Sequence, residues 1–419
     1  MNQRSEGITA LLLEYARAEP PSDVRAVMEL SVLDWAACGI AGQAEGGFGP
    51  WAAGLDGQGE ATRFDGRLDT PAQAALVNGT LSHALDYDDT HFAHIGHPSV
   101  VVVSAALAVA QTQGGGMARM VDAALIGAEA AVAVGLWLGR GHYQVGYHQT
   151  ATAGAFGATV AAARLLGLEA EQLRHALGLC ATMASGLKGQ FGTMGKPLNA
   201  GLAARTGVEA AMWARAGMTS APDGLAGPLG FGETHHGAGD PVAFEWRMGA
   251  VSHKFHACCH GLHATLEAVR DIDLAGAKAI TVHTHPRWMS VCNQPAPDTG
   301  LSAKFSYAHV LAMAAHGRDT GDIAAFSDAC AQDPALVAFR NRVRVVADEG
   351  LSEMQARVEV DGAVHNHDLD AALPFEARAA RVRAKAHALV GDRAEALRQA
   401  ITRGDLERFA ALLVPHPGQ

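Results

Sequence analysis

The sequence predicts a mainly α-helical protein in which a large all-helical domain is joined to a smaller α+β domain. Two observations predict this fold class. Ala- and Leu-rich segments with helical periodicity follow one another from residue 8 to residue 270, whereas strand-like alternation first appears near residue 277. The length of 419 residues, with 49% hydrophobic residues, allows two or three domains with a sizeable core.

The first region is expected to be helical almost throughout, with Gly- and Pro-containing loops between the helices. The expected helices cover residues 8–18, 23–41, 72–86, 98–112, 118–138, 150–166, 170–187, 197–216 and 259–270. No strand is expected before residue 277. We therefore expect the main part of a helical domain over residues 1–272.

The second region begins where the hydrophobic period changes. Residues 277–285 alternate around Ile280 and Val282, and further strands are expected at 342–348 and 355–367. Within the last of these, Asp361-Gly362 is a dipeptide typical of a two-residue hairpin turn. A helix is expected at 301–316, and helices at 375–389, 391–402 and 404–413 close the chain. The pattern predicts an α+β domain over residues 273–370 and a helical segment over 371–419.

Charge and composition exclude several classes of function. The net charge of −11 argues against nucleic acid or an anionic membrane as the main partner. The six cysteines show no framework spacing, which favours a reducing compartment, and the first seven residues lack the layout of an export signal. The most apolar stretches, 99–111 and 121–138, are short or contain Glu129, so no membrane span is expected. These features predict a cytoplasmic protein.

The segment from His83 to Ser99 is the richest in chemistry. It holds three carboxylates and four imidazoles, namely Asp86, Asp88, Asp89, His83, His91, His94 and His97. Pro98 suits the first position of the following helix, where its missing N–H costs nothing. His97 is therefore expected at the start of a helix.

The same arrangement recurs at three other places. His148, Lys196 and Lys254 each precede a segment of small residues that is expected to begin a helix. Helix N-termini present unpaired N–H donors and partial positive charge, and small residues let a ligand approach closely. If these helix starts meet, they form a pocket for a small di- or tricarboxylate. Lys196 and Lys254 would then bind carboxylates, while His97 and His148 would transfer protons.

Simpler interpretations of these residues remain open. A single His or Lys at a helix start is usually a surface or capping residue. Asp88, Asp89 and Thr90 could equally cap or terminate helices.

Two clusters also have the residue types of a metal site. One is formed by His91, His94 and His97 with the nearby aspartates, and the other by Cys258-Cys259-His260 with His263. The sequence has no His-Glu-x-x-His or Cys-x-x-Cys motif, and Pro98 separates the first cluster from its helix. We therefore expect neither a metal nor another cofactor, and a metal-dependent hydrolase is a distant alternative.

Several of these motifs resemble those of the MmgE/PrpD family. Residues 83–90, with the sequence HALDYDDT, and His97-Pro98-Ser99 are similar to the family signature. The similarity continues, in the same order, through residues 148–157, 195–201, 254–263 and 304–307. The resemblance implies a helical domain with a smaller α+β lid, a homodimer, and a cofactor-free active site between the domains.

The resemblance also implies a set of site residues. The matching catalytic or binding positions are Asp86, Thr90, His97, His148, Lys196 and Lys254, with His260 as a further substrate-binding candidate. Compared with the family's decarboxylases, the segment between Thr90 and His97 is one residue longer, and His260 stands one position later.

The expected function is that of a cofactor-independent lyase, either a dehydratase or a decarboxylase. It would remove a proton next to a carboxylate of a small di- or tricarboxylate, with Asp86 orienting an imidazole and lysines binding the developing negative charge. An epimerase or isomerase of an amino- or imino-dicarboxylate, using the same His97 and His148 pair, is the alternative. A non-catalytic carboxylate-binding protein is a third class.

Overall fold

The computed structural model describes residues 5–414. Residues 1–4 and 415–419 lie outside that range. The expectation that the first seven residues lack an export signal falls partly on these residues. The chain forms two compact units. The helical unit comprises the chain up to His253 and from Val382 onward, and the mixed unit comprises Lys254–Arg381. The domain boundaries expected from the sequence, 272/273 and 370/371, stay a prediction.

Helices make up nearly all of the regular structure in the helical unit. In its first part these are α1 (Ser5–Arg17), α2 (Ser22–Gly42), α3 (Phe48–Ala53), α4 (Pro71–Ser82), α5 (Pro98–Thr112), α6 (Met117–Gln144), α7 (Gln149–Leu166), α8 (Ala170–Met183), α9 (Gly195–Arg215) and α10 (Phe231–Thr234). The C-terminal residues add the second half of α17 (Phe375–Val390), α18 (Arg393–Arg403) and α19 (Leu406–Leu413). The mainly α-helical fold class is confirmed.

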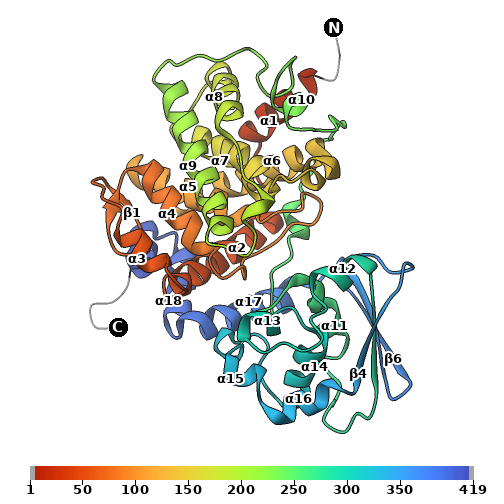
Figure 1. The fold of residues 1–419 in the computed structure, drawn as a ribbon. Helices are drawn as coiled ribbons and strands as arrows, with labels where there is room; N and C mark the ends of the chain where they lie inside the picture. Colours follow the sequence, from red (N-terminus) through yellow and green to blue (C-terminus); the bar gives the residue numbers. More distant parts are fainter. Residues whose placement is uncertain (1–4, 415–419) are drawn as a thin grey trace. The chain divides into compact units, whose positions relative to one another are not determined.

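The centre of the helical unit is α5, which packs against α4, α6, α7 and α9 (Figure 1). Every residue from Pro98 to Ala110 is buried. Because each side of α5 meets another helix, its sequence is apolar all round instead of carrying one apolar stripe. The polar residues at its N-terminal end are consequently held in a rigid, largely buried setting.

One helix among the described residues, α6, is long and apolar enough to cross a membrane by length and composition alone. Within its most apolar stretch, 89% of the residues are buried in the protein. Packing against α5 and α7 accounts for this apolar sequence, as is usual for a core helix.

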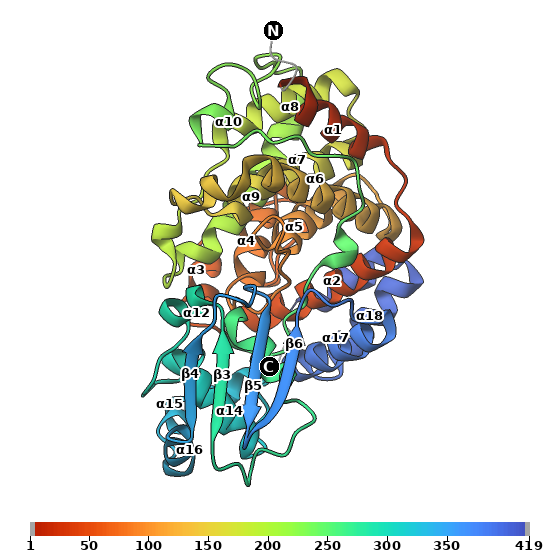
Figure 2. The ribbon, with the colours of Figure 1, turned by 90° about the vertical axis from the view of Figure 1, so that its right-hand side faces the viewer.

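The mixed unit contains a four-stranded sheet in the order β4-β3-β5-β6 (Figure 2). The strands are β3 (Ile280–Thr284), β4 (Val343–Ala347), β5 (Gln355–Val360) and β6 (Ala363–Asp368). β4 runs parallel to β3, and the other neighbouring pairs are antiparallel. The predicted hairpin is confirmed: Val360 pairs with Ala363 across Asp361 and Gly362, which both have positive φ angles.

Three short helices of this unit, α11, α12 and α14, pack against strands of the sheet. The helices of the mixed unit are α11 (His263–Ala268), α12 (Pro286–Val291), α13 (Gly300–Ala303), α14 (Tyr307–Ala315), α15 (Asp328–Ala331), α16 (Pro334–Arg340) and the first half of α17.

Several expected element boundaries were wrong. The helix expected over 301–316 is broken into α13 and α14, because Ser306 caps α14 by accepting a hydrogen bond from the backbone N–H of His309. The helix expected over 259–270 shrinks to α11, preceded by a 3₁₀ turn at His260–Leu262. The expectation of no strand before residue 277 was also wrong, since β1 (Ala61–Thr62) pairs with β2 (Leu68–Asp69).

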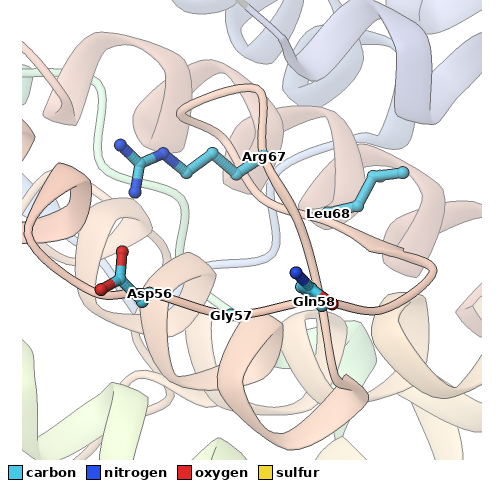
Figure 3. Close-up of a pocket in the computed structure, with 5 residues that line it drawn as sticks. All are labelled: Asp56, Gly57, Gln58, Arg67 and Leu68. Carbon is cyan, nitrogen blue, oxygen red and sulfur yellow. The ribbon is translucent and has the colours of Figure 1, made fainter.

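An open groove of about 730 Å³ lies beside β1 and β2. Its lining residues are Asp56, Gly57, Gln58, Arg67 and Leu68 (Figure 3). None of the residues predicted to form the functional site lines this groove. The groove is therefore separate from the residues predicted to form the site.

Candidate active site

The loop that follows α4 carries the three carboxylates of the predicted motif, Asp86, Asp88 and Asp89. α4 ends at Ser82, four residues earlier than expected, and the fully buried His83 forms its C-terminal cap. Asp86 has a φ angle of 49°, a left-handed conformation that cannot continue a helix. The Asp86 side chain is half exposed, whereas Asp88, two residues later, is 1% exposed.

Two histidines stand directly before helices, as predicted. His97 is the N-terminal cap of α5, with Pro98 at the first helical position, and His148 is the N-terminal cap of α7. The backbone N–H of His97 donates a hydrogen bond to Oγ1 of Thr150, in the first turn of α7, at 3.0 Å. This bond connects the start of α5 to the start of α7.

Lys196 lies in the first turn of α9, which crosses α4 at very short distance. A Cβ atom on Gly201 would lie 2.2 Å from the carbonyl oxygen of Leu76, so only glycine permits this crossing. The crossing brings the first turn of α9 to the loop after α4, where Nζ of Lys196 lies 2.7 Å from Oδ2 of Asp86.

Asp88 lies between two imidazoles. Its Oδ1 is 2.9 Å from Nδ1 of His83, and its Oδ2 is 2.8 Å from Nδ1 of His97. The two rings are 4.6 Å apart between centroids. Burial alone would raise the pKa of Asp88, but the imidazoles of His83 and His97 together hold this pKa well below its usual range. Asp88 is therefore an ionised carboxylate inside the protein.

The second ring nitrogen of His97 faces the other carboxylate. Nε2 of His97 is 3.5 Å from Oδ1 of Asp86. The other oxygen of Asp86, Oδ2, pairs with Lys196. The side chains thus form a continuous polar chain in the order Lys196, Asp86, His97, Asp88 and His83.

His148 joins this chain from the start of α7. Its ring stacks on that of His83 at 6.1 Å between centroids and meets the edge of Phe191 at 5.0 Å. Its Nδ1 is 3.3 Å from Nδ2 of Asn199. Burial, followed by the nearby charge of Lys196, lowers the pKa of His148 well below its ordinary value, so this imidazole is neutral at pH 7.

The capping interpretation holds for Asp89 and not for Asp88. Asp89 accepts hydrogen bonds from the backbone N–H of Ser99 at 3.3 Å and from its hydroxyl at 2.5 Å. The backbone N–H of Ser99, at the start of α5, was expected to be available to a ligand, but it donates to Asp89 instead. Thr90, which is 9% exposed, is joined to Ser252 by two backbone hydrogen bonds of 2.8 Å.

The metal cluster suggested by the sequence does not form around His91, His94 and His97. Nε2 of His91 is 2.9 Å from the carbonyl oxygen of Arg247, and the His94 ring is fully buried against Gly135. Burial lowers the pKa of His94 to about 3, which leaves this imidazole neutral. Among the described residues, the Cys258, Cys259, His260 and His263 set also forms no metal-binding group.

A different set of donors does lie close together. His83, Asp86, Asp88 and His97 each offer one ligand atom, and these atoms lie within 4.8 Å of one another. Oxygen and imidazole donors of this kind suit several divalent ions. However, the Lys196 ammonium already neutralises Asp86, and both oxygens of Asp88 face imidazole nitrogens. The arrangement favours a proton-transfer network over a cation site.

Lys254 and His260 belong to the mixed unit. Lys254 is 3% exposed, and its positive charge contributes to lowering the pKa of His263 well below its usual value, after burial and the charges of His260 and His256. The His260 ring stacks on that of His263 at 4.7 Å between centroids. The chain from Lys254 to Cys259 is not helical, and the stretch from Lys254 to His260 leads into the 3₁₀ turn and α11, so it precedes a helix as expected.

The structure brings together Asp86, His97, His148 and Lys196, and adds three residues that the sequence analysis did not assign to the site: His83, Asp88 and Asn199. His83 and Asp88 were visible in the same motif, and their five-residue spacing spans the end of α4. Asn199, in the first turns of α9, had no sequence signal that could connect it with His148.

Two family models match the chain, and together they cover most of it. The MmgE/PrpD N-terminal domain matches residues 6–242, and the MmgE/PrpD C-terminal domain matches residues 256–407. The first match contains the whole polar chain from His83 to Lys196.

Curated relatives are similar at low identity. A cis-aconitate decarboxylase-like protein of Aspergillus oryzae is 29% identical over 300 residues, which is 63% of this chain and 61% of that protein. A cis-aconitate decarboxylase of Aspergillus terreus is 26% identical over 356 residues, 73% of this chain and 71% of the relative. The human cis-aconitate decarboxylase is 30% identical over 171 residues, 39% of this chain and 34% of the human protein. With more than half of its residues matched by the N-terminal model alone, the chain belongs to the MmgE/PrpD family.

Proposed function

We propose that this protein is a cofactor-independent lyase that acts on a small di- or tricarboxylate, by dehydration or decarboxylation. The first step would be removal of a proton from the carbon next to a carboxylate. Family membership and the names of the curated relatives support the reaction class. The observation that carries the proposal is the grouping of two imidazoles and an ammonium group, from three different helices, around one carboxylate-bearing loop.

The charges of the site suit this reaction. Proton removal next to a carboxylate builds negative charge on the carboxylate oxygens, and a fixed positive group nearby stabilises it. Lys196, whose ammonium pairs with Asp86, supplies that positive group. A substrate carboxylate could compete with the half-exposed Asp86 for Lys196 at low desolvation cost. His97 and His148 would handle the proton.

The proposal extends to residues outside the polar chain. Lys254 would bind a second carboxylate, and Thr90 and His260 would contact substrate, as the motif similarity implies. We also expect a homodimer; sedimentation equilibrium of the purified protein tests this, and a monomer at micromolar concentration would contradict it.

The decisive experiment is hydrogen exchange in deuterated water. Citrate-, aconitate-, tartrate- and aspartate-like compounds are incubated with the protein, and NMR follows both deuterium at the carbon next to the carboxylate and product formation. We expect exchange with at least one tri- or dicarboxylate, together with loss of water or CO₂. Absence of exchange and of product for every compound, in protein that is folded, would contradict the proposal.

The same experiment separates the epimerase alternative. An epimerase would exchange the proton and change the optical rotation of an aspartate-like substrate without releasing water or CO₂. This alternative would use the same pair, His97 and His148, whose rings both lie beside that of His83. Two proton-handling groups can epimerise a carbon when one removes its proton and the other returns a proton to the opposite face.

A metal-dependent hydrolase makes the opposite prediction for chelators. Activity is measured before and after extensive treatment with EDTA, and bound metal is measured by mass spectrometry. We expect unchanged activity and no stoichiometric metal. Chelator-sensitive turnover restored by one divalent ion would instead assign the four-donor set, His83, Asp86, Asp88 and His97, to a metal.

A further inference from the structure

We propose that Asp88 and Asn199 are positioning residues that hold His97 and His148 in opposite tautomers, so that His97 accepts the proton and His148 donates a hydrogen bond. This inference rests on the proposed function for its catalytic meaning. Its structural part, the position of one proton on each ring, stands on contacts within the helical unit.

Asp88 determines which nitrogen of His97 carries the proton. Oδ2 of Asp88 is 2.8 Å from Nδ1 of His97, at ion-pair distance, although the two atoms are not aligned as a hydrogen bond. The negative charge of this oxygen favours an N–H on the ring nitrogen nearest to it, and a carboxylate cannot donate a proton to that nitrogen. The proton of a neutral His97 therefore lies on Nδ1. This leaves a lone pair on Nε2, the nitrogen on the side of Asp86 and Lys196.

Neither partner in this contact is free to move away. His83 holds the other oxygen of Asp88 at 2.9 Å, from the end of α4. His97 is fixed by the start of α5 and by the hydrogen bond from its backbone N–H to Thr150. Because both sides are anchored in buried helices, the geometry of the pair is set by the fold before any substrate binds.

Asn199 has the opposite effect on His148. Its amide nitrogen Nδ2 lies 3.3 Å from the backbone carbonyl oxygen of Leu187 and 3.3 Å from Nδ1 of His148. A carbonyl oxygen accepts only from the amide nitrogen, so the contact with Leu187 fixes the orientation of the amide. Nδ1 of His148 then accepts a hydrogen bond, and the proton of this neutral imidazole lies on Nε2.

Other charged and titratable groups surround His97. These groups are Asp86 and Asp88 on the loop after α4, His83 at the end of α4, His94 on the loop before α5, His148 at the start of α7 and Lys196 on α9. Of the two carboxylates, Asp86 is paired with Lys196, whereas Asp88 is buried and contacts imidazoles alone among the described residues. Asp88 is consequently the group that acts on Nδ1.

These tautomers assign the roles in the first chemical step. The substrate C–H bond breaks, its proton forms an N–H bond with Nε2 of His97, and its electron pair remains on the carboxylate-stabilised carbanion. His97 becomes an imidazolium beside the Asp88 carboxylate, which stabilises the new charge. His148 donates a hydrogen bond from Nε2 to the substrate, on which negative charge develops, and it keeps its proton, as expected of an imidazole that stays neutral.

Nitrogen NMR tests the tautomers directly, without substrate. Long-range ¹H–¹⁵N spectra of histidine-labelled full-length protein distinguish protonated from unprotonated ring nitrogens, and His97→Gln and His148→Gln variants assign the two signals. We expect a proton on Nδ1 of His97 and on Nε2 of His148. The reverse pattern on either ring in the unmodified protein would overturn the inference, whatever the behaviour of the variants.

Two reciprocal substitutions test the positioning residues. Asp88→Asn should remove the Nδ1 preference of His97 and leave His148 unchanged, whereas Asn199→Asp should move the proton of His148 to Nδ1. Asp89→Asn is the matched control, because Asp89 is equally buried but bonds to Ser99. We expect this control to change neither ring. Unchanged spectra in a folded Asp88→Asn variant would contradict the role of Asp88.

Kinetics adds a readout that a purely structural role would not move. Asp88→Asn should lower kcat for exchange about 10²- to 10⁴-fold with little change in KM, as loss of a His–Asp pair does elsewhere. The acidic limb of kcat/KM should move to lower pH, because an imidazolium beside a neutral amide is less favoured. Asp89→Asn should leave this limb in place. A limb at the same pH in Asp88→Asn would contradict the inference.

The two proposals fail in different ways. If the unmodified protein exchanges no substrate proton while the NMR tautomers are as expected, the proposed function fails and the positioning assignment stands. If exchange occurs but the tautomers are reversed or insensitive to Asp88, the positioning inference fails alone.

Discussion

Adjacent residues in one loop can have opposite protonation behaviour, as Asp88 and Asp89 do. Both are 1% exposed. The pKa of Asp88 is held well below its usual range, whereas burial raises that of Asp89 to about 7. The difference comes from their partners. The imidazoles of His83 and His97 lower the pKa of Asp88 more than burial raises it, whereas the hydrogen bonds that Ser99 donates to Asp89 lower its pKa less than burial raises it. At the residue scale, the chemistry of this site is decided by partners more than by burial.

The raised pKa of Asp89 predicts a pH-dependent effect on stability. In the unfolded chain Asp89 titrates near its ordinary value of 3.8, and in the folded protein near 7. Between these values the folded state binds the extra proton, so this residue makes the free energy of unfolding fall as pH rises through that window. In Asp89→Asn this contribution is absent. Relative to the unmodified protein, the variant should therefore gain about 1 to 4 kcal/mol between about pH 4 and about pH 8.

Urea unfolding of both proteins at the two pH values measures this difference. A difference in unfolding free energy that is independent of pH would show that Asp89 is ionised in the folded protein.

Removal of the Lys196 ammonium should weaken substrate binding with little effect on stability. We expect Lys196→Ala to raise KM by about 10- to 100-fold, the loss of one charge-assisted hydrogen bond. Because Lys196 pairs with a half-exposed Asp86, thermal unfolding should change by no more than about 1 kcal/mol. Lys188→Ala is the control, since Lys188 donates instead to the carbonyl oxygen of Tyr143. An unfolded Lys196→Ala variant would make Lys196 a structural residue.

At the scale of elements, the crossing of α4 and α9 is what places the site residues. Gly79 and Gly201 face each other there: a Cβ atom on Gly79 would lie 2.9 Å from the Cα atom of Gly201. The C-terminal end of α4, with His83, and the N-terminal end of α9, with Lys196, therefore meet at one place. Sequence periodicity predicts both helices, but it carries no information on which residues touch at a crossing.

A single methyl group should disturb this crossing. Gly201→Ala would place a Cβ atom 2.2 Å from both the carbonyl oxygen of Leu76 and Oγ1 of Thr80. Since backbone must move, we expect the free energy of unfolding to fall by about 1 to 3 kcal/mol and KM to rise as Lys196 shifts. Gly7→Ala, a helical glycine with open space around its Cβ position, is the control and should be neutral or slightly stabilising. If Gly201→Ala and Gly7→Ala had equal free energies of unfolding, the close contact of α4 and α9 at Gly201 would be contradicted.

At the scale of the whole molecule, a residue near the C-terminal end of the chain contacts the loop that carries the site residues. Lys385, on the part of α17 that belongs to the helical unit, is buried, and its Nζ lies 2.6 Å from Oδ1 of Asp34 on α2. It also donates to the carbonyl oxygen of Tyr87 at 2.5 Å, in the loop between Asp86 and Asp88. Although burial alone would lower the pKa of Lys385, the charge of Asp34 raises it overall. Lys385 is therefore a buried ammonium group.

Breaking this ion pair should be costly. Lys385→Met leaves Asp34 as a buried carboxylate without its ammonium partner, so we expect a loss of about 3 to 5 kcal/mol in the free energy of unfolding. Adding Asp34→Leu removes the buried carboxylate as well, and the double variant should recover most of the loss. Chemical denaturation of the three proteins measures both effects. Additive losses in the double variant would show that the pair is not coupled.

The amino-acid sequence by itself determined the mainly helical class, the apolar α5, the Asp361-Gly362 hairpin and the positions of His97 and His148 at helix starts. Each of these follows from local periodicity, from a proline at the first helical position or from a turn dipeptide, and such signals need no distant partner. The same local reasoning was wrong where it extended α4 to residue 86 and joined α13 to α14. A left-handed Asp86 follows the end of α4, and the Ser306 side chain caps α14, and both features override helical propensity.

Only the tertiary structure decided how the charges are paired. The sequence offered four imidazoles and three carboxylates within one motif, and their spacing could not choose between a metal cluster, helix caps and a proton network. Packing of α4, α5, α7 and α9 made that choice by burying Asp88 between His83 and His97 and by bringing Asn199 to His148. The pKa of a buried group depends on neighbours that are distant in sequence, so this chemistry exists only once the helices have packed.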